Sequence, residues 1–247
     1  MTTTLVVGTA DLRQALTAVR PHACTDKEIP DLARIRLTVD PQNLTITGTD
    51  RFTCGLAIVS VWELAWEPDD TDLVELLAED IAKLLTIFKA PAKDGGEDGP
   101  QYTLRFEITA DQVTVTDCSG FDIVGRRYRM PRLETADALD LVPQLVDRIH
   151  GSKLVLLDGV KDMTVSGDHL ARFKVASSTY DRPVSLETRG EGRSNSPTIL
   201  VRCGESFLGL MMPRRLLDDD VQRAREWADG WTARLPGIVG AAAAGGA

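Results

Sequence analysis

TILVRCGESFLGLMMPRRL, residues 198–216, carries the most specific pattern in the chain. Residues 198–201 and 207–212 each form a strand-like run, and Gly204 and Glu205 supply a turn between them. This spacing predicts a β-hairpin. Pro213 cannot donate a hydrogen bond to a sheet, so we expect the second strand to end there or to continue only as an edge. A methionine-rich apolar segment that leaves a sheet edge is typical of adaptable surfaces that accept several partners.

The second half of this stretch resembles a known family. The run E-x-F-x-G-L-M-M-P-R-R-L at residues 205–216 is similar to the closing strand of bacterial replicative sliding clamps, the β subunits of DNA polymerase III. In that family an MPMRL-like ending forms part of the pocket that binds polymerase and clamp-loader peptides. Here Arg214 stands where the family usually has a second methionine, and the chain continues for about thirty residues more.

A second resemblance lies at residues 45–57, T-I-T-G-T-D-R-F-T-C-G-L-A. Sliding clamps carry a similar strand–turn–strand segment, with an ATDGHRLA-like form in their middle domain. Here residues 51–54, R-F-T-C, replace the tighter turn of the family. The alternative is ordinary turn chemistry, because Asp and Thr favour turns between strands in any protein.

Composition restricts the possible classes of protein. A chain of 247 residues with 43% hydrophobic residues suits one large or two small domains. Four widely spaced cysteines without a C-x-x-C pair predict reduced, mostly buried thiols in a cytoplasmic protein. We see neither a membrane-length apolar run nor a signal-peptide pattern, so no membrane association is expected. The net charge of −9 argues against bulk attraction to DNA, although an acidic exterior can coexist with a basic inner face.

Residues 2–62 and 73–127 share one order of predicted elements: a strand, a helix and three strands. A pair of such units makes a natural domain, with two antiparallel sheets outside and two helices side by side. This α+β, DNA-clamp-like architecture is also what the resemblance implies. We therefore expect a first clamp-like domain at 1–130, a second, abbreviated one at 131–217, and a C-terminal helix with a disordered tail at 218–247.

The second domain is predicted to be incomplete. From Ser166 onward the pattern fits a strand–helix–three-strand unit. Residues 133–165 are too few for another and predict a short helix near 141–149 and strand-like runs at 153–157 and 163–165. Clamps of phage and eukaryotic type use two domains per chain and close as trimers. The resemblance thus implies a trimeric ring. The short segment at 133–165 instead favours a clamp-fold protein that does not encircle DNA.

The predicted helices each carry a basic residue on the face away from their apolar positions. On an arbitrary helix such a face is simply solvated, and Asp80 and Asp147 count against a basic inner surface. In a clamp, however, these side chains would face duplex DNA. The candidate DNA-facing residues are Arg13, Arg20, Lys83, Lys89, Arg148, Arg172 and Lys174.

The basic cluster at residues 126–132 is either a solvated linker or a segment that contacts phosphates. By resemblance it leads from one domain to the next, and Pro131 matches a proline of that segment. The resemblance also implies a partner pocket between the domains, in which Arg214 narrows the pocket or favours an acidic peptide. The pocket residues are Thr49, Arg51, Phe52, Pro131, Leu210, Met212, Pro213, Arg214 and Leu216.

The C-terminal segment begins with three aspartates, which suit a helix N-terminus. We expect a helix over 221–234 that docks its tryptophans on its own domain or on a partner, followed by an unstructured tail from 237. No motif for catalysis, a metal or a cofactor stands out, and the three histidines are scattered.

The leading hypothesis is a non-enzymatic processivity factor that encircles duplex DNA without sequence preference and tethers DNA polymerase and clamp-loader peptides. The alternatives are a non-encircling adaptor or decoy that binds replication proteins, and an enzyme of unrecognised type.

Overall fold

The computed structural model describes residues 2–65, 73–89, 102–119, 125–154, 164–190, 197–214 and 217–244, and the side chains up to residue 238. Several predictions fall between those ranges. They include residues 155–157 of the strand predicted near 153–157, and Leu216 of the predicted pocket. These lie outside the described residues.

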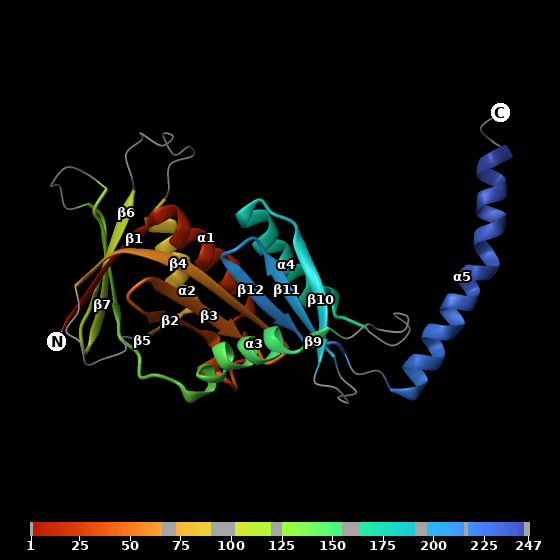
Figure 1. Cartoon of the computed structure of the whole chain (residues 1–247), viewed down its shortest axis with the longest axis horizontal. Coiled ribbons are helices and arrows are strands. Elements are labelled where there is room, and N and C mark those ends of the chain that lie inside the picture. Colours follow the sequence, from red (N-terminus) through yellow and green to blue (C-terminus); the bar gives the residue numbers. More distant parts are fainter. Residues whose placement is uncertain are drawn as a thin grey trace.

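The first part of the chain contains two repeats of a strand, a helix and three strands, and the last strand of the second repeat lies at 127–131, beyond the predicted end of that repeat at residue 127 (Figure 1). The first repeat consists of β1 (Thr3–Gly8), α1 (Thr9–Val19), β2 (Arg34–Val39), β3 (Asn43–Thr49) and β4 (Thr53–Ala65), with the 3₁₀ helices η1 (Arg20–His22) and η2 (Pro30–Ala33) between α1 and β2. The second repeat consists of β5 (Leu73–Leu77), α2 (Ala78–Ile87), β6 (Thr103–Ile108), β7 (Gln112–Asp117) and β8 (Arg127–Pro131).

The remainder contains one helix followed by three strands, and one fragment; in the described residues, only an isolated bridge at Thr164 precedes that helix. The fragment is η3 (Asp137–Leu139), α3 (Leu141–Gly151) and the two-residue strand β9 (Lys153–Leu154). The fuller set is α4 (Gly167–Tyr180), β10 (Val184–Gly190), β11 (Thr198–Cys203) and β12 (Phe207–Met211). The C-terminal helix α5 (Asp218–Ala244) is longer than the predicted helix and includes residues expected to be unstructured.

All strands pair antiparallel, and β4 joins the two parts of the sheet. The main path runs β8-β7-β6-β1-β4-β12-β11-β10-β9, with β3, β2 and β5 branching from the other edge of β4. The thirteen residues of β4 make this possible, because Thr53–Ala57 pairs with β12 while the opposite end pairs with β1. The fold is therefore α+β with a continuous antiparallel sheet, which confirms the predicted fold class.

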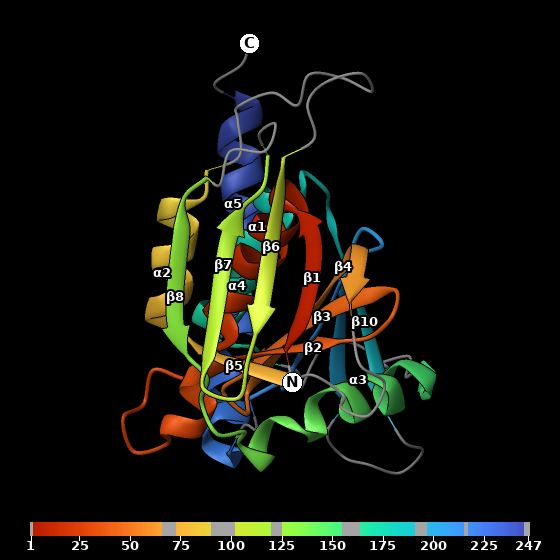
Figure 2. The ribbon, with the colours of Figure 1, turned by 90° about the vertical axis from the view of Figure 1, so that its left-hand side faces the viewer.

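Helices α1, α2 and α4 lie on the inner faces of the sheet. Figure 2 shows α1 and α4 behind β6 and β7, and α2 beside β8. In α1 the apolar residues recur at helical spacing, so one face is buried in the core while the polar residues lie on the other. The large core cluster also includes Phe173 of α4 and Phe207 of β12. The core thus continues from the first part of the chain into the second.

Helix α3 lies on the opposite, outer face of the sheet. Its buried residues Val142, Val146 and Ile149 contact Leu200 and Leu210, whose neighbours in the strands face the inner helices. Because side chains alternate between the two faces of a strand, α3 and α4 cover opposite sides of β11 and β12. The helix itself was predicted, but its position on the outer face was not.

A buried ion pair anchors the segment that leads into α3. Arg36 Nη2 lies 2.8 Å from Glu75 Oε1 and also donates a hydrogen bond to the Ala136 carbonyl at 2.6 Å. The Ala136 N–H donates in turn to Glu75 Oε1 at 3.0 Å. Arg36 also pairs with Asp140 directly before α3. These contacts hold the segment against β2 and β5.

Most of the basic cluster at 126–132 forms strand β8, so the expectation of a solvated linker was wrong, while contact of this cluster with phosphates stays a prediction. Tyr128 and Met130 turn toward the core while Arg127 and Arg129 are exposed. This alternation of polar and apolar residues is that of a half-buried strand. Proline at position 131 is tolerated because β8 is an edge strand in the described sheet.

Candidate partner pocket and inner helix surface

Hydrogen bonds within the turn between β3 and β4 fix its shape in the predicted pocket. The Asp50 carboxylate accepts hydrogen bonds from the backbone N–H groups of Phe52 at 3.0 Å and Thr53 at 2.7 Å. Arg51 adopts a φ of 77°, a left-handed conformation that non-glycine residues seldom adopt. The Arg51 side chain is exposed, and the Phe52 side chain is 59% exposed. The turn therefore presents one cation and one aromatic ring to solvent.

Helix α4 fixes this turn from the neighbouring part of the chain. Arg172 forms an ion pair with Asp50 and donates a hydrogen bond to Thr53 Oγ1 at 2.6 Å. Burial alone would raise the pKa of Asp50, but the Thr53 N–H and the Arg172 guanidinium outweigh it and lower the pKa below its usual value. One turn earlier on α4, the His169 ring stacks on Phe52 with centroids 5.6 Å apart.

The end of β12 lies beside the same turn. The Met212 N–H donates to the Phe52 carbonyl at 2.8 Å, and the Arg214 N–H donates to the Thr164 carbonyl at 2.6 Å. Met212 and Pro213 are half-buried, and Arg214 is exposed. Six predicted pocket residues thus come together in what we call the Phe52–Met212 patch. It comprises Thr49, Arg51, Phe52, Met212, Pro213 and Arg214.

The other three predicted pocket residues do not join this patch. Leu210 is only 2% exposed, because α3 covers it together with Cys54. Pro131 pairs with Gln112 at the end of β8, and four strands separate β8 from β12 along the sheet. Leu216 lies outside the described residues. The accessible patch is therefore smaller and more basic than the predicted pocket.

Three of the predicted DNA-facing cations have partners within the protein. Arg13 donates hydrogen bonds to the carbonyls of Leu85 and Phe88, which lie in and after the last turn of α2, and Lys83 pairs with Asp80 at 3.1 Å. Arg172 pairs with Asp50. These three side chains stabilise contacts within the protein, so less of their positive charge is available to bind phosphates.

The remaining four cations are exposed, but on two sides of the sheet. Lys174 lies on α4, Arg20 begins η1 directly after α1, and Lys89 lies two residues after α2, so these three lie on or directly after the inner helices. Arg148 belongs to α3 on the outer face. It cannot contribute to the same surface as the other three.

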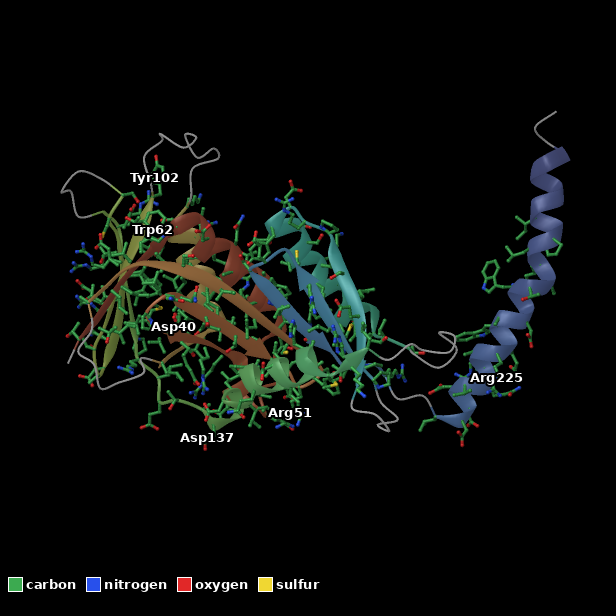
Figure 3. All side chains as sticks on the ribbon, in the orientation of Figure 1. Asp40, Arg51, Trp62, Tyr102, Asp137 and Arg225 are labelled. Atoms are coloured by element: carbon green, nitrogen blue, oxygen red, sulfur yellow. The ribbon has the colours of Figure 1, made fainter. Side chains whose placement is uncertain are left out.

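Sequence reasoning missed the parts of the site that come from distant elements. His169 and Arg172 lie three residues apart, which places both on one side of α4. That spacing was visible, but nothing in the sequence paired this helix face with the Asp50 turn. In the side-chain view, Arg51 lies in the region of α3 and the second part of the sheet (Figure 3).

The fold is that of DNA polymerase sliding clamps. Similar solved structures include the DNA polymerase III β subunit of Thermotoga maritima, with 13% sequence identity and a TM-score of 0.54. The DNA polymerase sliding clamp of Bacillus subtilis has 15% identity and a TM-score of 0.54. The DNA polymerase III β subunit of Borrelia burgdorferi, in complex with a natural product, has 10% identity and a TM-score of 0.53. The matches cover 87% of this chain in each case, and 66%, 64% and 64% of those chains respectively.

The likeness is one of fold, because identity is so low. No family model matches the chain, and no curated protein is similar to it in sequence. Among the described helices, none has both the length and the apolar character needed to cross a bilayer.

Proposed function

We propose that the chain is a sliding-clamp-like, non-catalytic factor that holds replication proteins on duplex DNA. The observation that carries this proposal is the clamp fold together with the Phe52–Met212 patch at the junction of β4 and β12. In this proposal the inner helices contact phosphates through Arg20, Lys89 and Lys174. Such contacts carry no sequence information, which sliding requires.

The patch is proposed to bind a short peptide of a polymerase or clamp loader. Phe52, Met212 and Pro213 offer apolar surface, while Arg51 and Arg214 flank it with positive charge. Because α3 fills the space over Leu210, little of the apolar floor remains for a ligand. We therefore expect a short peptide that combines an aromatic or leucine side chain with acidic residues.

The peptide proposal is tested by the Met212→Ala substitution. Loss of a central apolar contact is expected to weaken binding of a fluorescent acidic Leu-Phe peptide about tenfold, the usual order for a residue at the centre of an interface. Leu186→Ala is the matched control, because Leu186 is an exposed apolar residue on β10. Both variants should keep the parent's unfolding midpoint. Unchanged affinity in Met212→Ala would remove the patch from the binding site.

The proposed assembly is a homo-oligomeric ring, with a trimer favoured. The alternative is an adaptor that uses the same patch without encircling DNA. The two proposals differ in whether the edge strands β8 and β9 of neighbouring copies must meet, which a ring requires and an adaptor does not. β8 offers five residues at its edge, whereas β9 has two in the described part of the chain. Retention on nicked circular DNA, with release after linearisation, would support the ring. Equal retention on both forms would contradict encirclement.

A further inference from the structure

Helix α5 presents an exposed apolar stripe, and among the described residues neither hydrophobic core cluster includes any residue of this helix. The helix extends away from the sheet and its other helices (Figure 1). Leu217, directly before it, is 69% exposed, and Trp231 is 58% exposed, with Leu235 and Ile238 also exposed. An apolar surface of this kind on a soluble helix normally marks an interaction site.

The spacing of the stripe identifies the kind of partner. Apolar residues recur in alternating steps of four and three over three heptads. In coiled-coil notation, Val221, Ala228 and Leu235 occupy a positions, and Leu217, Ala224, Trp231 and Ile238 occupy d positions. A repeat of 3.5 residues keeps a seam of a and d positions facing one other helix. Trp227, which is 66% exposed, occupies the g position beside this seam and widens the apolar face there.

The residues that weaken helices lie away from this seam. Gly230 and Gly237 occupy c positions and Pro236 occupies a b position, so all three face outward from a paired helix. Glycine and proline both lower intrinsic helix stability. A helix of this composition gains most from a partner along its other face, because packing rather than propensity supplies most helical stability in proteins.

The charges beside the seam favour a second copy of the same helix. Asp220 occupies a g position and Arg225 the following e position. Within one helix these residues point about 140° apart, so they do not face each other. In a parallel, in-register pair, Asp220 of one copy lies opposite Arg225 of the other, and symmetry repeats this contact.

We propose that the α5 helices of two copies pair as a parallel, in-register coiled coil along Leu217, Val221, Ala224, Ala228, Trp231, Leu235 and Ile238. This contact does not depend on the sheet edges or on the Phe52–Met212 patch. It therefore stands or falls separately from the proposed ring and peptide site.

The first experiment is the molar mass of the full chain by light scattering across concentrations. We expect the parent to self-associate and the double variant Trp231→Asp, Leu235→Asp to dissociate at least tenfold more readily. Ala233→Asp is the control for placing an aspartate on this helix, since it adds one of the two negative charges at an exposed f position. A parent that stays monomeric, or a double variant that associates as the parent does, would overturn the proposal.

Two further variants test the parallel register. Val221→Cys at an a position should form an inter-chain disulfide on oxidation, because a positions of parallel partners lie within disulfide reach. Glu226→Cys at an f position should behave like the parent chain. Asp220→Arg and Arg225→Asp should each weaken association, and combining them should restore part of it. No cross-link at 221, or no recovery in the charge-swapped chain, would contradict the parallel in-register pair.

Discussion

His22 is buried at the junction of the two parts of the chain, and in the described structure neither of its ring nitrogens has a hydrogen-bond partner. Its ring lies 4.8 Å from that of Phe173 on α4 and 6.1 Å from that of Phe207 on β12, measured between centroids. Gly55 is required beside it, because a Cβ there would lie 2.7 Å from the imidazole. The neutral imidazole thus serves as a core side chain between α1, β4 and the second part of the sheet.

This environment makes stability depend on pH. Burial, followed by the charge of Arg172, lowers the pKa of His22 to about 3. The unfolded chain takes up this proton near pH 6.5, so the full stability is present above that pH and is lost as pH falls toward the folded pKa. The slope is about 1.4 kcal/mol per pH unit, which gives a loss of about 2 kcal/mol at pH 5.

The prediction is checked by urea unfolding at pH 7 and pH 5. His22→Leu should remove this part of the pH dependence, whatever its effect at pH 7. Leu5→Ala is the control, because it removes a buried side chain without removing a titratable group and should leave the slope unchanged. Equal slopes in the parent and in His22→Leu would show that His22 does not titrate as proposed.

Among the elements, the sequence predicts strands and helices well and their contacts poorly. Period-two and helical patterns indicated β1 to β7 and α1 to α4 because one face of each is buried. Strand β8 was missed because Arg126 to Arg132 dominate its composition, although Tyr128 and Met130 alternate inward. The pattern of α3 showed an apolar face, but periodicity does not tell which side of a sheet that face covers.

In the candidate site, too, local parts were predicted from the sequence and long-range contacts were not. The Asp50 turn and the Met212 strand end were identified from local motifs, and the structure brings them together through the pairing of β4 with β12. The Arg172–Asp50 ion pair joins residues 122 positions apart, and no local signal links them. Leu210 matched the motif as well as Met212 did, but α3 covers Leu210 and leaves Met212 accessible.

The position of α3 leads to a prediction about Cys54 beneath it. Burial raises the pKa of the Cys54 thiol to about 12, so the folded protein exposes almost no reactive thiolate. Val146→Ala leaves a cavity under α3 and should destabilise its contact by on the order of 1–2 kcal/mol. Alkylation of Cys54, followed by peptide mass spectrometry, should then become about tenfold faster.

Asp147→Ala is the matched control for this measurement, since Asp147 is the exposed neighbour on the same helix. It should leave the alkylation rate of Cys54 unchanged. If Val146→Ala also left that rate unchanged while Cys54 reacted only on global unfolding, α3 would not open separately from the sheet.

For the whole molecule, the central question is how an acidic chain of net charge −9 would hold DNA. The position of the individual cations matters more than the net charge of the chain, because phosphate contacts act within about a Debye length, roughly 8–10 Å at physiological salt. Arg13, Lys83 and Arg172 have internal partners. The proposed DNA contacts therefore depend on Arg20, Lys89 and Lys174 on the inner helices.

This leads to a prediction about the salt dependence of DNA binding. Each phosphate contact contributes a slope of about −0.9 to log K against log salt concentration, so replacing Arg20, Lys89 and Lys174 by alanine should make the slope shallower by up to about three. Arg148→Ala, on the outer face, is the control and should leave the slope unchanged. Fluorescence anisotropy with a labelled duplex at several salt concentrations measures both. If Arg148→Ala changed the slope as much as each inner cation did, DNA would not be confined to the inner helices, because no single face of the sheet carries all four residues.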